Sequence, residues 1–494
     1  MKLFKQILLT SAVGLAGIAG AQAADLPFRK AAPVEYVRVC DWTGAGYFYI
    51  PGTDTCLKVG GIIRAEYAYI QNNSAFFPSP GVSTVAAPRA NGTFIPGRSR
   101  DASGFFARGR IDADARTQTA YGTLRTYVRF QIDRLQGNYS GGGVAGGQNS
   151  FANQGGNNAY LDKGFIQFAG FTAGRVQSFF DFYADNYNFE GIANSDESNN
   201  VFAYTATFGG GFSATISVED RNGRNLSQNI GNIAFGNGAI NPAAGLNGLA
   251  GANAVYAGET IPDVVGVLRV DQAWGAAQIS AAYHDVNTVA GPLGNVAIAN
   301  QFANSTTEGF AVQGGVQIKL PMLAAGDDLW IEGGYQEGAY LYQDSSNYLN
   351  AGFNSLALGG FQHIDRDAVA IGNGAGGYTL QKGSGFHVMG ALHHYFTPQF
   401  HDVLFGSYET IGYGNIVKNI DWTRGGIGDA SEFRVGNQFI FTPVHDLNFG
   451  VEVIYMRIDQ TLAHELGQVA TALPVGVKKN PDAFEARLRV ERDF

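Results

Sequence analysis

The chain has 494 residues, of which 45% are hydrophobic, 15% are charged and 68 are glycine. Its 33 basic and 42 acidic side chains give a formal net charge of -9, and they include no basic block of the kind that binds nucleic acid. The mean hydropathy of -0.06 argues against a helical membrane protein, and the 35 Phe and 23 Tyr argue against a disordered chain.

The first 23 residues have the layout of a secretory signal peptide. Lys2 and Lys5 precede an apolar stretch over 7–19, and small residues at 21–23 form a cleavage site. The apolar stretch is too short to span a bilayer. We therefore expect residues 1–23 to be removed on export.

The only two cysteines, Cys40 and Cys56, follow soon after this leader. An exported protein enters an oxidising compartment, where two such cysteines can pair. A redox-active or metal-binding pair would favour the closer CxxC spacing. A structural disulfide is the favoured interpretation, within an N-terminal periplasmic-side segment over residues 24–56.

Strict alternation of polar and apolar residues recurs along the rest of the chain. Within 107–118, for example, charged and polar residues at even positions interleave with mostly small or apolar residues at odd positions. A period of two predicts strands with one polar and one apolar face. The pattern predicts sixteen strands, at 57–70, 105–119, 123–135, 160–168, 172–180, 200–208, 212–220, 262–273, 276–286, 308–320, 328–341, 384–396, 402–413, 431–441, 447–458 and 482–494.

The connections between these strands are alternately long and short. The loop over 71–104 is followed by a turn over 120–122, and the same order continues to the end of the chain. An even number of amphipathic strands, short turns at one end and long loops at the other are typical of outer-membrane barrels. A soluble β-sandwich would also alternate, but charges in series suit a wet lumen better. We expect an all-β chain whose residues 57–494 form a 16-stranded antiparallel transmembrane barrel.

The N-terminal stretch resembles a known family. Residues 36–40 (YVRVC) and 44–61 (GAGYFYIPGTDTCLKVGG) are similar to the amino-terminal signature of the alphaproteobacterial porins, and Phe494 matches their terminal aromatic residue. The resemblance implies a trimeric outer-membrane channel whose third external loop folds into the lumen. The long loops at 221–261 and 342–383 depart from the family pattern and leave a role in surface recognition open.

In a channel, width and electric field matter more than catalytic groups. The inward positions of neighbouring strands place eight arginines on one wall, because strand sixteen must pair with strand one: Arg64, Arg108, Arg110, Arg116, Arg125, Arg129, Arg487 and Arg489. The third long connection, 181–199, holds five acids and no base: Asp181, Asp185, Glu190, Asp196 and Glu197. If this loop folds inward as the resemblance implies, its acids face the basic wall and set ion preference. Alternatively, the wall charges pair across strands and only stiffen the barrel.

Small residues on the outward faces of the first strands indicate a protein contact. Gly61, Ala65, Gly109 and Ala113 make a poor lipid-facing surface but permit close packing. We expect a homotrimer that associates through strands one to three. The alternative is that these strands face lipid and offer it only a small apolar surface.

Together these features predict a porin for passive diffusion of small hydrophilic solutes and ions, without enzymatic activity, cofactor, metal site or nucleic-acid partner. A substrate-selective porin for sugars or similar solutes is the alternative, because Phe182, Tyr183, Tyr187 and Phe189 could form an aromatic track in the loop. A barrel phospholipase would need a serine near an outward histidine, and none is evident beside His394.

Overall fold

The computed structural model describes residues 38–71, 75–78, 92–95, 101–140, 156–225, 229–230, 254–290, 303–345, 367–372, 378–414, 429–461 and 480–494. The expected signal peptide, 1–23, and residues 24–37 of the N-terminal segment lie outside these ranges.

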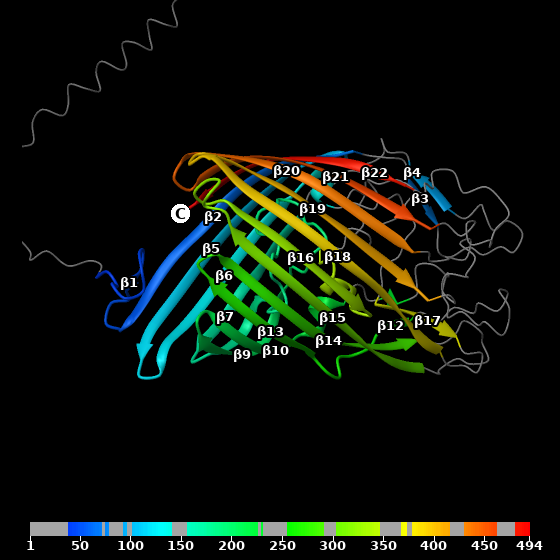
Figure 1. Ribbon diagram of the computed structural model, residues 1–494, viewed down its shortest axis with the longest axis horizontal. Helices are drawn as coiled ribbons and strands as arrows, with labels where there is room; N and C mark the ends of the chain where they lie inside the picture. The colour runs from blue at the N-terminus through cyan, green and yellow to red at the C-terminus, as the bar shows by residue number, and fades with distance from the viewer. Residues whose placement is uncertain are drawn as a thin grey trace, which may run out of the picture.

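Sixteen antiparallel strands form a closed barrel, as the alternation predicts (Figure 1). The barrel strands are β2 (Thr55–Ile70), β5 (Ser103–Thr119), β6 (Gly122–Leu135), β7 (Gly156–Phe168), β8 (Phe171–Gln177), β9 (Ser198–Gly209), β10 (Phe212–Glu219), β13 (Asp263–Gln272), β14 (Gly275–Ala290), β15 (Ala303–Lys319), β16 (Asp328–Glu337), β18 (Tyr378–Thr397), β19 (Phe400–Tyr413), β20 (Ala430–Val444), β21 (Leu447–Gln460) and β22 (Asp482–Asp493). Shorter strands accompany the ends of the barrel: β1 (Phe48–Tyr49), β3 (Ala75–Pro78), β4 (Gly92–Ile95), β11 (Asn229–Ile230), β12 (Ala254–Tyr256) and β17 (Ala368–Gly372).

The first and last barrel strands close the cylinder. β2 pairs with β22 from Ile62 opposite Asp493 to Ile70 opposite Glu485. Phe494 extends the contact, because its backbone N–H and C=O bond to those of Gly61 at 3.0 and 3.1 Å. Closure pairs both sides of β2, and so the sheet leaves no free edge in a solvent without hydrogen-bonding partners.

Short turns lie at one end of the barrel and long connections at the other. Residues 120–121, 169–170 and 273–274 are examples of the short turns, which share their end with the C-terminus (Figure 1). The connections at the opposite end include 178–197 and the residues that follow β16, 338–345. We call the first the short-turn mouth and the second the long-loop mouth; in outer-membrane barrels these face the periplasm and the exterior.

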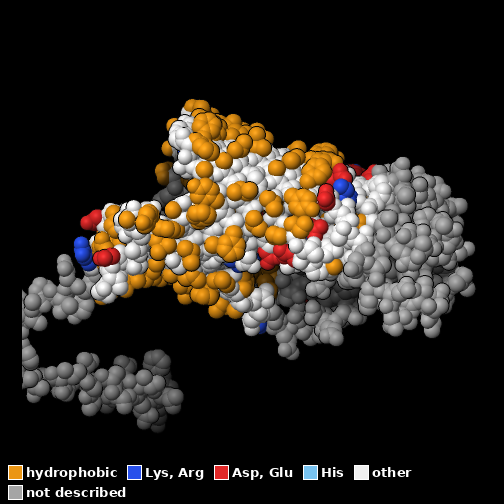
Figure 2. Space-filling view, turned by 90° about the horizontal axis from the view of Figure 1, so that it is seen from below, with side chains coloured by type: hydrophobic (Ala, Val, Ile, Leu, Met, Phe, Trp, Pro, Cys, Tyr) orange, Lys and Arg blue, Asp and Glu red, His pale blue; other side chains and the backbone are white. Residues whose placement is uncertain are grey.

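The outer face of the barrel is apolar. Val59 and Ile63 of β2 are 52% and 59% exposed, and Ile216 of β10 is 59% exposed. Figure 2 shows a broad hydrophobic band over the outside, with few charged side chains within it. Such a band matches a hydrocarbon environment and would be costly in water over so large an area. No helix among the described residues is long and apolar enough to span a bilayer.

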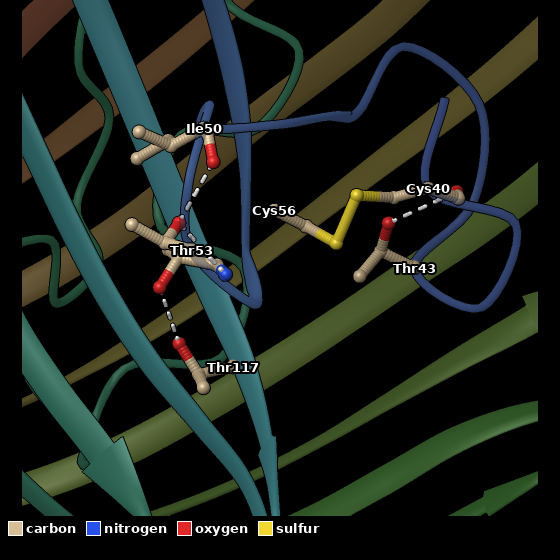
Figure 3. The surroundings of a disulfide bond; sticks show 7 residues. Cys40, Thr43, Ile50, Thr53, Cys56 and Thr117 are labelled. Atoms are coloured by element: carbon tan, nitrogen blue, oxygen red, sulfur yellow. Dashed lines mark hydrogen bonds between the residues drawn. A yellow bond between two sulfur atoms is a disulfide. The ribbon is translucent and has the colours of Figure 1, made fainter. Parts of the chain in front are cut away.

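The described part of the N-terminal segment, residues 38–54, folds back on the short-turn mouth. We call it the hook. A disulfide joins Cys40 of the hook to Cys56 of β2, with the two Cα atoms 6.1 Å apart (Figure 3). Both cysteines are buried, and they pack with Tyr47. The disulfide is therefore structural, as the sequence predicts, and fixes the hook to the barrel.

Gly61 is required where the barrel closes. A Cβ atom there would lie 2.2 Å from the carbonyl oxygen of Arg110 and 2.8 Å from the Phe494 ring. We expect Gly61→Val to cost about 1–3 kcal/mol of barrel stability through overpacking. The measurement is the urea midpoint of the folded, heat-modifiable form. Gly266→Val in β13 is the control, because a Cβ atom there would meet no other atom within 4 Å; equal losses in both variants would refute the importance of Gly61 for closure.

Candidate channel constriction

The third long connection, residues 178–197, lies inside the barrel. We call it L3. It follows β8 and precedes β9, and it contacts the inner faces of strands from β10 round to β22. The family resemblance implies this inward fold, and the contacts confirm it. L3 therefore narrows the lumen from one side.

Buried glutamates of the barrel wall hold the backbone N–H groups of L3. Glu219 of β10 accepts from Phe179 N at 3.1 Å, and Glu332 of β16 accepts from Tyr183 N at 3.0 Å. Glu452 of β21 accepts from two consecutive amides, those of residues 189 and 190, at 2.6 and 2.9 Å. Because a carboxylate accepts strong charge-assisted hydrogen bonds, these contacts fix the path of the loop.

Polar side chains of the wall also donate to the carbonyl groups of L3. Gln278 of β14 reaches the carbonyls of residues 179, 180 and 181 at 3.0–3.3 Å. Gln438 of β20 donates to Tyr187 O at 2.7 Å, and Arg434 donates to Gly191 O at 3.2 Å. An irregular segment can be buried only if its backbone groups find partners, and here the wall supplies them.

Aromatic side chains of L3 pack into spaces left by wall glycines. A Cβ at Gly315 would lie 2.4 Å from the Phe182 ring, and one at Gly450 would lie 2.4 Å from the Phe189 ring. Phe182 and Tyr183 are buried against Trp330, with ring centroids 5.0 and 5.6 Å away. These aromatics therefore attach L3 to the wall.

Two other connections fasten L3 at the long-loop mouth. Arg224, in the 3-10 helix η3 (Arg221–Arg224), is fully buried and donates to Asp181 and Ser195 of L3, both at 2.9 Å. The same guanidinium donates to Leu341 O at 2.9 Å in the helix η6 (Tyr340–Tyr342), and it lies over the Tyr342 ring. Arg224 thus links three connections that are distant in sequence.

The arginines of the predicted basic wall lie on the inner faces of β2, β5, β6 and β22, and most pair with acids of adjacent strands. The pairs are Arg64 with Glu491, Arg108 with Asp133 at 2.8 Å, Arg129 with Asp112 at 2.7 Å, and both Arg116 and Arg125 with Asp114 at 2.9 Å. Arg110 donates to Gln131 at 2.7 Å and lies 3.8 Å from Asp162. The six arginine side chains of β2, β5 and β6 remain 17–30% exposed, so this part of the wall stays open to the lumen, whereas Arg487 and Arg489 of β22 are 9% and 11% exposed.

The basic wall meets L3 at β22. Arg487 forms ion pairs with Glu190 of L3, with Glu485 and, at 3.3 Å, with Glu66. Arg489 pairs with Glu66 at 2.5 Å, and its guanidinium lies 3.6 Å from the centre of the Phe189 ring. Of the five acids in L3, Glu190 is the one that contacts a wall arginine within the described ion pairs.

The other L3 acids have different partners. Asp181 is buried with Arg224, and Asp185 accepts from Asn188 at 2.8 Å within the loop. Asp196 and Glu197 are half-buried at the end of the loop. Burial and the nearby Asp181 raise the pKa of Asp196 to about 6. Burial also raises the pKa of Glu197 to about 7, against the opposing effect of Arg224.

Sequence reasoning missed the residues that hold L3. Glu219, Glu332, Glu452 and Gln278 look in the sequence like other inward polar positions, and Arg224 falls in the predicted loop 221–261. The available signal is the inward glycines within strands, such as Gly315 and Gly450, because a glycine in a strand interior marks a close approach of other atoms.

The closed barrel, the apolar outer band and the inserted loop define an outer-membrane channel of the porin class. Residues 25–483 match the model of the Porin subfamily, and the chain belongs to that family. It is similar to porin Omp2b of Brucella abortus (strain 2308), with 29% identity over 306 residues, which cover 60% of this chain and 71% of that protein. Porin Omp2b of Brucella melitensis biotype 1 matches with the same identity over the same share.

A solved structure supports the fold independently. The outer membrane channel DcaP of Acinetobacter baumannii aligns with a TM-score of 0.52 at 13% identity, over 90% of this chain and 99% of that chain. The family and the barrel together place the chain in the outer membrane as a porin channel.

Arg224 provides a direct test of the attachment of L3. Breaking a buried ion pair by removing one partner typically costs about 3–5 kcal/mol, and here the loss falls on L3. We expect Arg224→Gln to change single-channel conductance and to increase open-channel current noise. Arg221→Gln is the matched control, because Arg221 is equally buried in η3 but donates to the carbonyls of Asp285 and Ala257 outside L3. Identical traces from the two variants would contradict the role of Arg224.

Proposed function

We propose that small hydrophilic solutes and ions diffuse passively through the passage between L3 and the basic wall. The observation that carries this proposal is the position of L3. Its backbone is bonded to β10, β14, β16, β20 and β21, whereas the charged faces of β5 and β6 stay partly exposed. Polar solutes can replace contacts with water by contacts with the charged side chains of this wall, whereas apolar solutes gain no favourable contact on entry.

Ion preference depends on the balance of charge between the basic wall on one side of this passage and L3 on the other. The arginines of β5 and β6 are largely matched by Asp112, Asp114 and Asp133. The half-buried Asp196 and Glu197 belong to L3, and Lys163 of β7 lies close enough to Asp196 for their charges to interact. We infer that these charged groups produce an electric field across the passage. The side chains that are exposed to the lumen in each ion pair set the strength of that field.

The side-chain packing of L3 favours general diffusion over a sugar-selective track. Phe182 and Tyr183 are buried against β16, and Phe189 fills the space at Gly450. Tyr187, the fourth aromatic, is half-buried and donates to Asp328 at 2.7 Å. A stacking track for sugars needs aromatic faces open to the lumen, and three of these four are used for attachment.

The ion-preference proposal predicts the effect of charge reversal. We expect Arg108→Glu and Arg129→Glu each to shift the permeability ratio towards cations by a factor of about two, since screening at physiological salt acts over ~8 Å, comparable to a narrow lumen. Reversal potentials in planar bilayers measure the ratio. Arg457→Glu is the control, because Arg457 is exposed on the outward face of β21. Unchanged reversal potentials in the lumen variants would reject the selectivity role.

We also infer export by cleavage of residues 1–23. Mass spectrometry of the mature protein tests the cleavage. An N-terminus other than residue 24 would reject the expected site.

We further infer assembly as a homotrimer through β2, β5 and β6. The outward face of β5 carries the small residues Gly109, Ala113 and Ala115, which allow a second barrel to approach closely.

The trimer proposal predicts that bulk on this face prevents assembly. We expect Ala113→Trp to convert the trimer seen on unheated gels into monomer while leaving the barrel folded. Ile216→Trp makes a similar outward change on β10, where Ile216 is 59% exposed, and should leave the trimer intact. A trimer that persists in Ala113→Trp would place the contact elsewhere.

A further inference from the structure

The positive charges of the basic wall are matched unevenly along the barrel. Towards the middle of the wall, Arg108 has its own carboxylate in Asp133, and Arg129 has Asp112. At the short-turn mouth the arginines outnumber the carboxylates. Arg116 of β5 stands directly opposite Arg125 of β6, and both guanidiniums share the single carboxylate of Asp114. Like charges in this register repel unless a counter-ion is present.

A third cation belongs to the same group. Lys58 of β2 is the ladder partner of Asp114, and it is exposed. Among the ion pairs of the described residues, Lys58 takes part in none. Its ammonium end lies beside Gly46 of the hook, next to Tyr47. Two of these three cations contact the Asp114 carboxylate and Lys58 stands opposite it in the ladder, so the group of three cations and one carboxylate carries two positive charges in excess.

The hook holds this group in place. Tyr47 donates its hydroxyl proton to Asp114 at 2.8 Å, and its ring lies 4.8 Å from the Arg116 guanidinium. The Cys40–Cys56 disulfide and the bond from Cys40 N to Tyr47 O at 3.0 Å anchor the hook. Asp114 is 7% exposed, whereas the Arg116 and Arg125 side chains are 28% and 30% exposed. The carboxylate is thus covered, and the cations face the lumen.

We propose that Arg116, Arg125 and Lys58 form a binding site for a small oxyanion of the phosphate class at the short-turn mouth. The excess of two positive charges matches a dianion, and guanidinium groups bind phosphate and carboxylate oxygens in a bidentate manner. A fixed cluster also avoids much of the ordering cost of binding. The proposal rests on the channel function proposed above, since an anion bound at this mouth is detected by the current that it blocks.

Inorganic phosphate in planar bilayers tests the site. With potassium chloride as the carrier, we expect millimolar phosphate to reduce the single-channel current, more strongly from the short-turn side. Arg116→Gln should raise the half-blocking phosphate concentration by about tenfold, the usual effect of losing one charge-assisted hydrogen bond. Asp114 keeps Arg125 and Tyr47 as partners in this variant, so the barrel should remain folded. Arg116→Lys should retain part of the block.

The control removes the same charge from the same mouth. Arg492 of β22 lies 3.4 Å from Asp446 at this mouth and is 49% exposed, and Arg492→Gln should leave the phosphate block unchanged. If Arg116→Gln and the unaltered protein are blocked equally, or if phosphate blocks neither, the oxyanion site is wrong while the channel proposal stands. A protein that folds but conducts no ions would overturn the channel proposal itself.

Discussion

The constriction depends on hydrogen bonds between wall side chains and the backbone of a loop that has no regular structure. Glu219, Glu332 and Glu452 accept the N–H groups of L3, and Gln278 and Gln438 donate to its carbonyl groups. Without such partners, burial of the loop would leave its polar groups unsatisfied, each at a cost of about 1–3 kcal/mol. The inner wall therefore does two tasks: one half binds the loop, and the other half lines the passage.

This division also explains the distribution of glycine and charge around the barrel. Gly315 and Gly450 lie on the half that binds L3, where any Cβ would meet an aromatic ring of the loop. Paired arginines and aspartates lie on β5 and β6, where their side chains stay partly exposed. One half of the inner wall faces water and carries paired charges. The other half faces L3 and carries glycines that make room for its aromatic rings.

The sequence predicts the barrel well but does not predict which wall residues bind L3, for a physical reason. Alternation is local, so all sixteen strands are visible in it, and the strand 447–458 corresponds to Leu447–Gln460. Contacts of L3 are not local, and Glu452 looks the same in sequence whether it meets water or the loop. Strand ends fail for a related reason. The strand predicted at 172–180 ends at Gln177, because Phe180 turns inward and is buried against Tyr342.

The position of L3 can be tested most directly by tying the loop to the wall. Ala193 N donates to Ser407 Oγ of β19 at 3.0 Å, so the two residues are in contact and a pair of cysteines at these positions probes that contact. We expect the oxidised Ala193→Cys/Ser407→Cys channel to conduct like its reduced form and like the unaltered protein under the same treatment. Failure of the disulfide to form in a folded barrel, or a conductance that changes when it forms, would contradict the claim that L3 rests against this wall while ions pass.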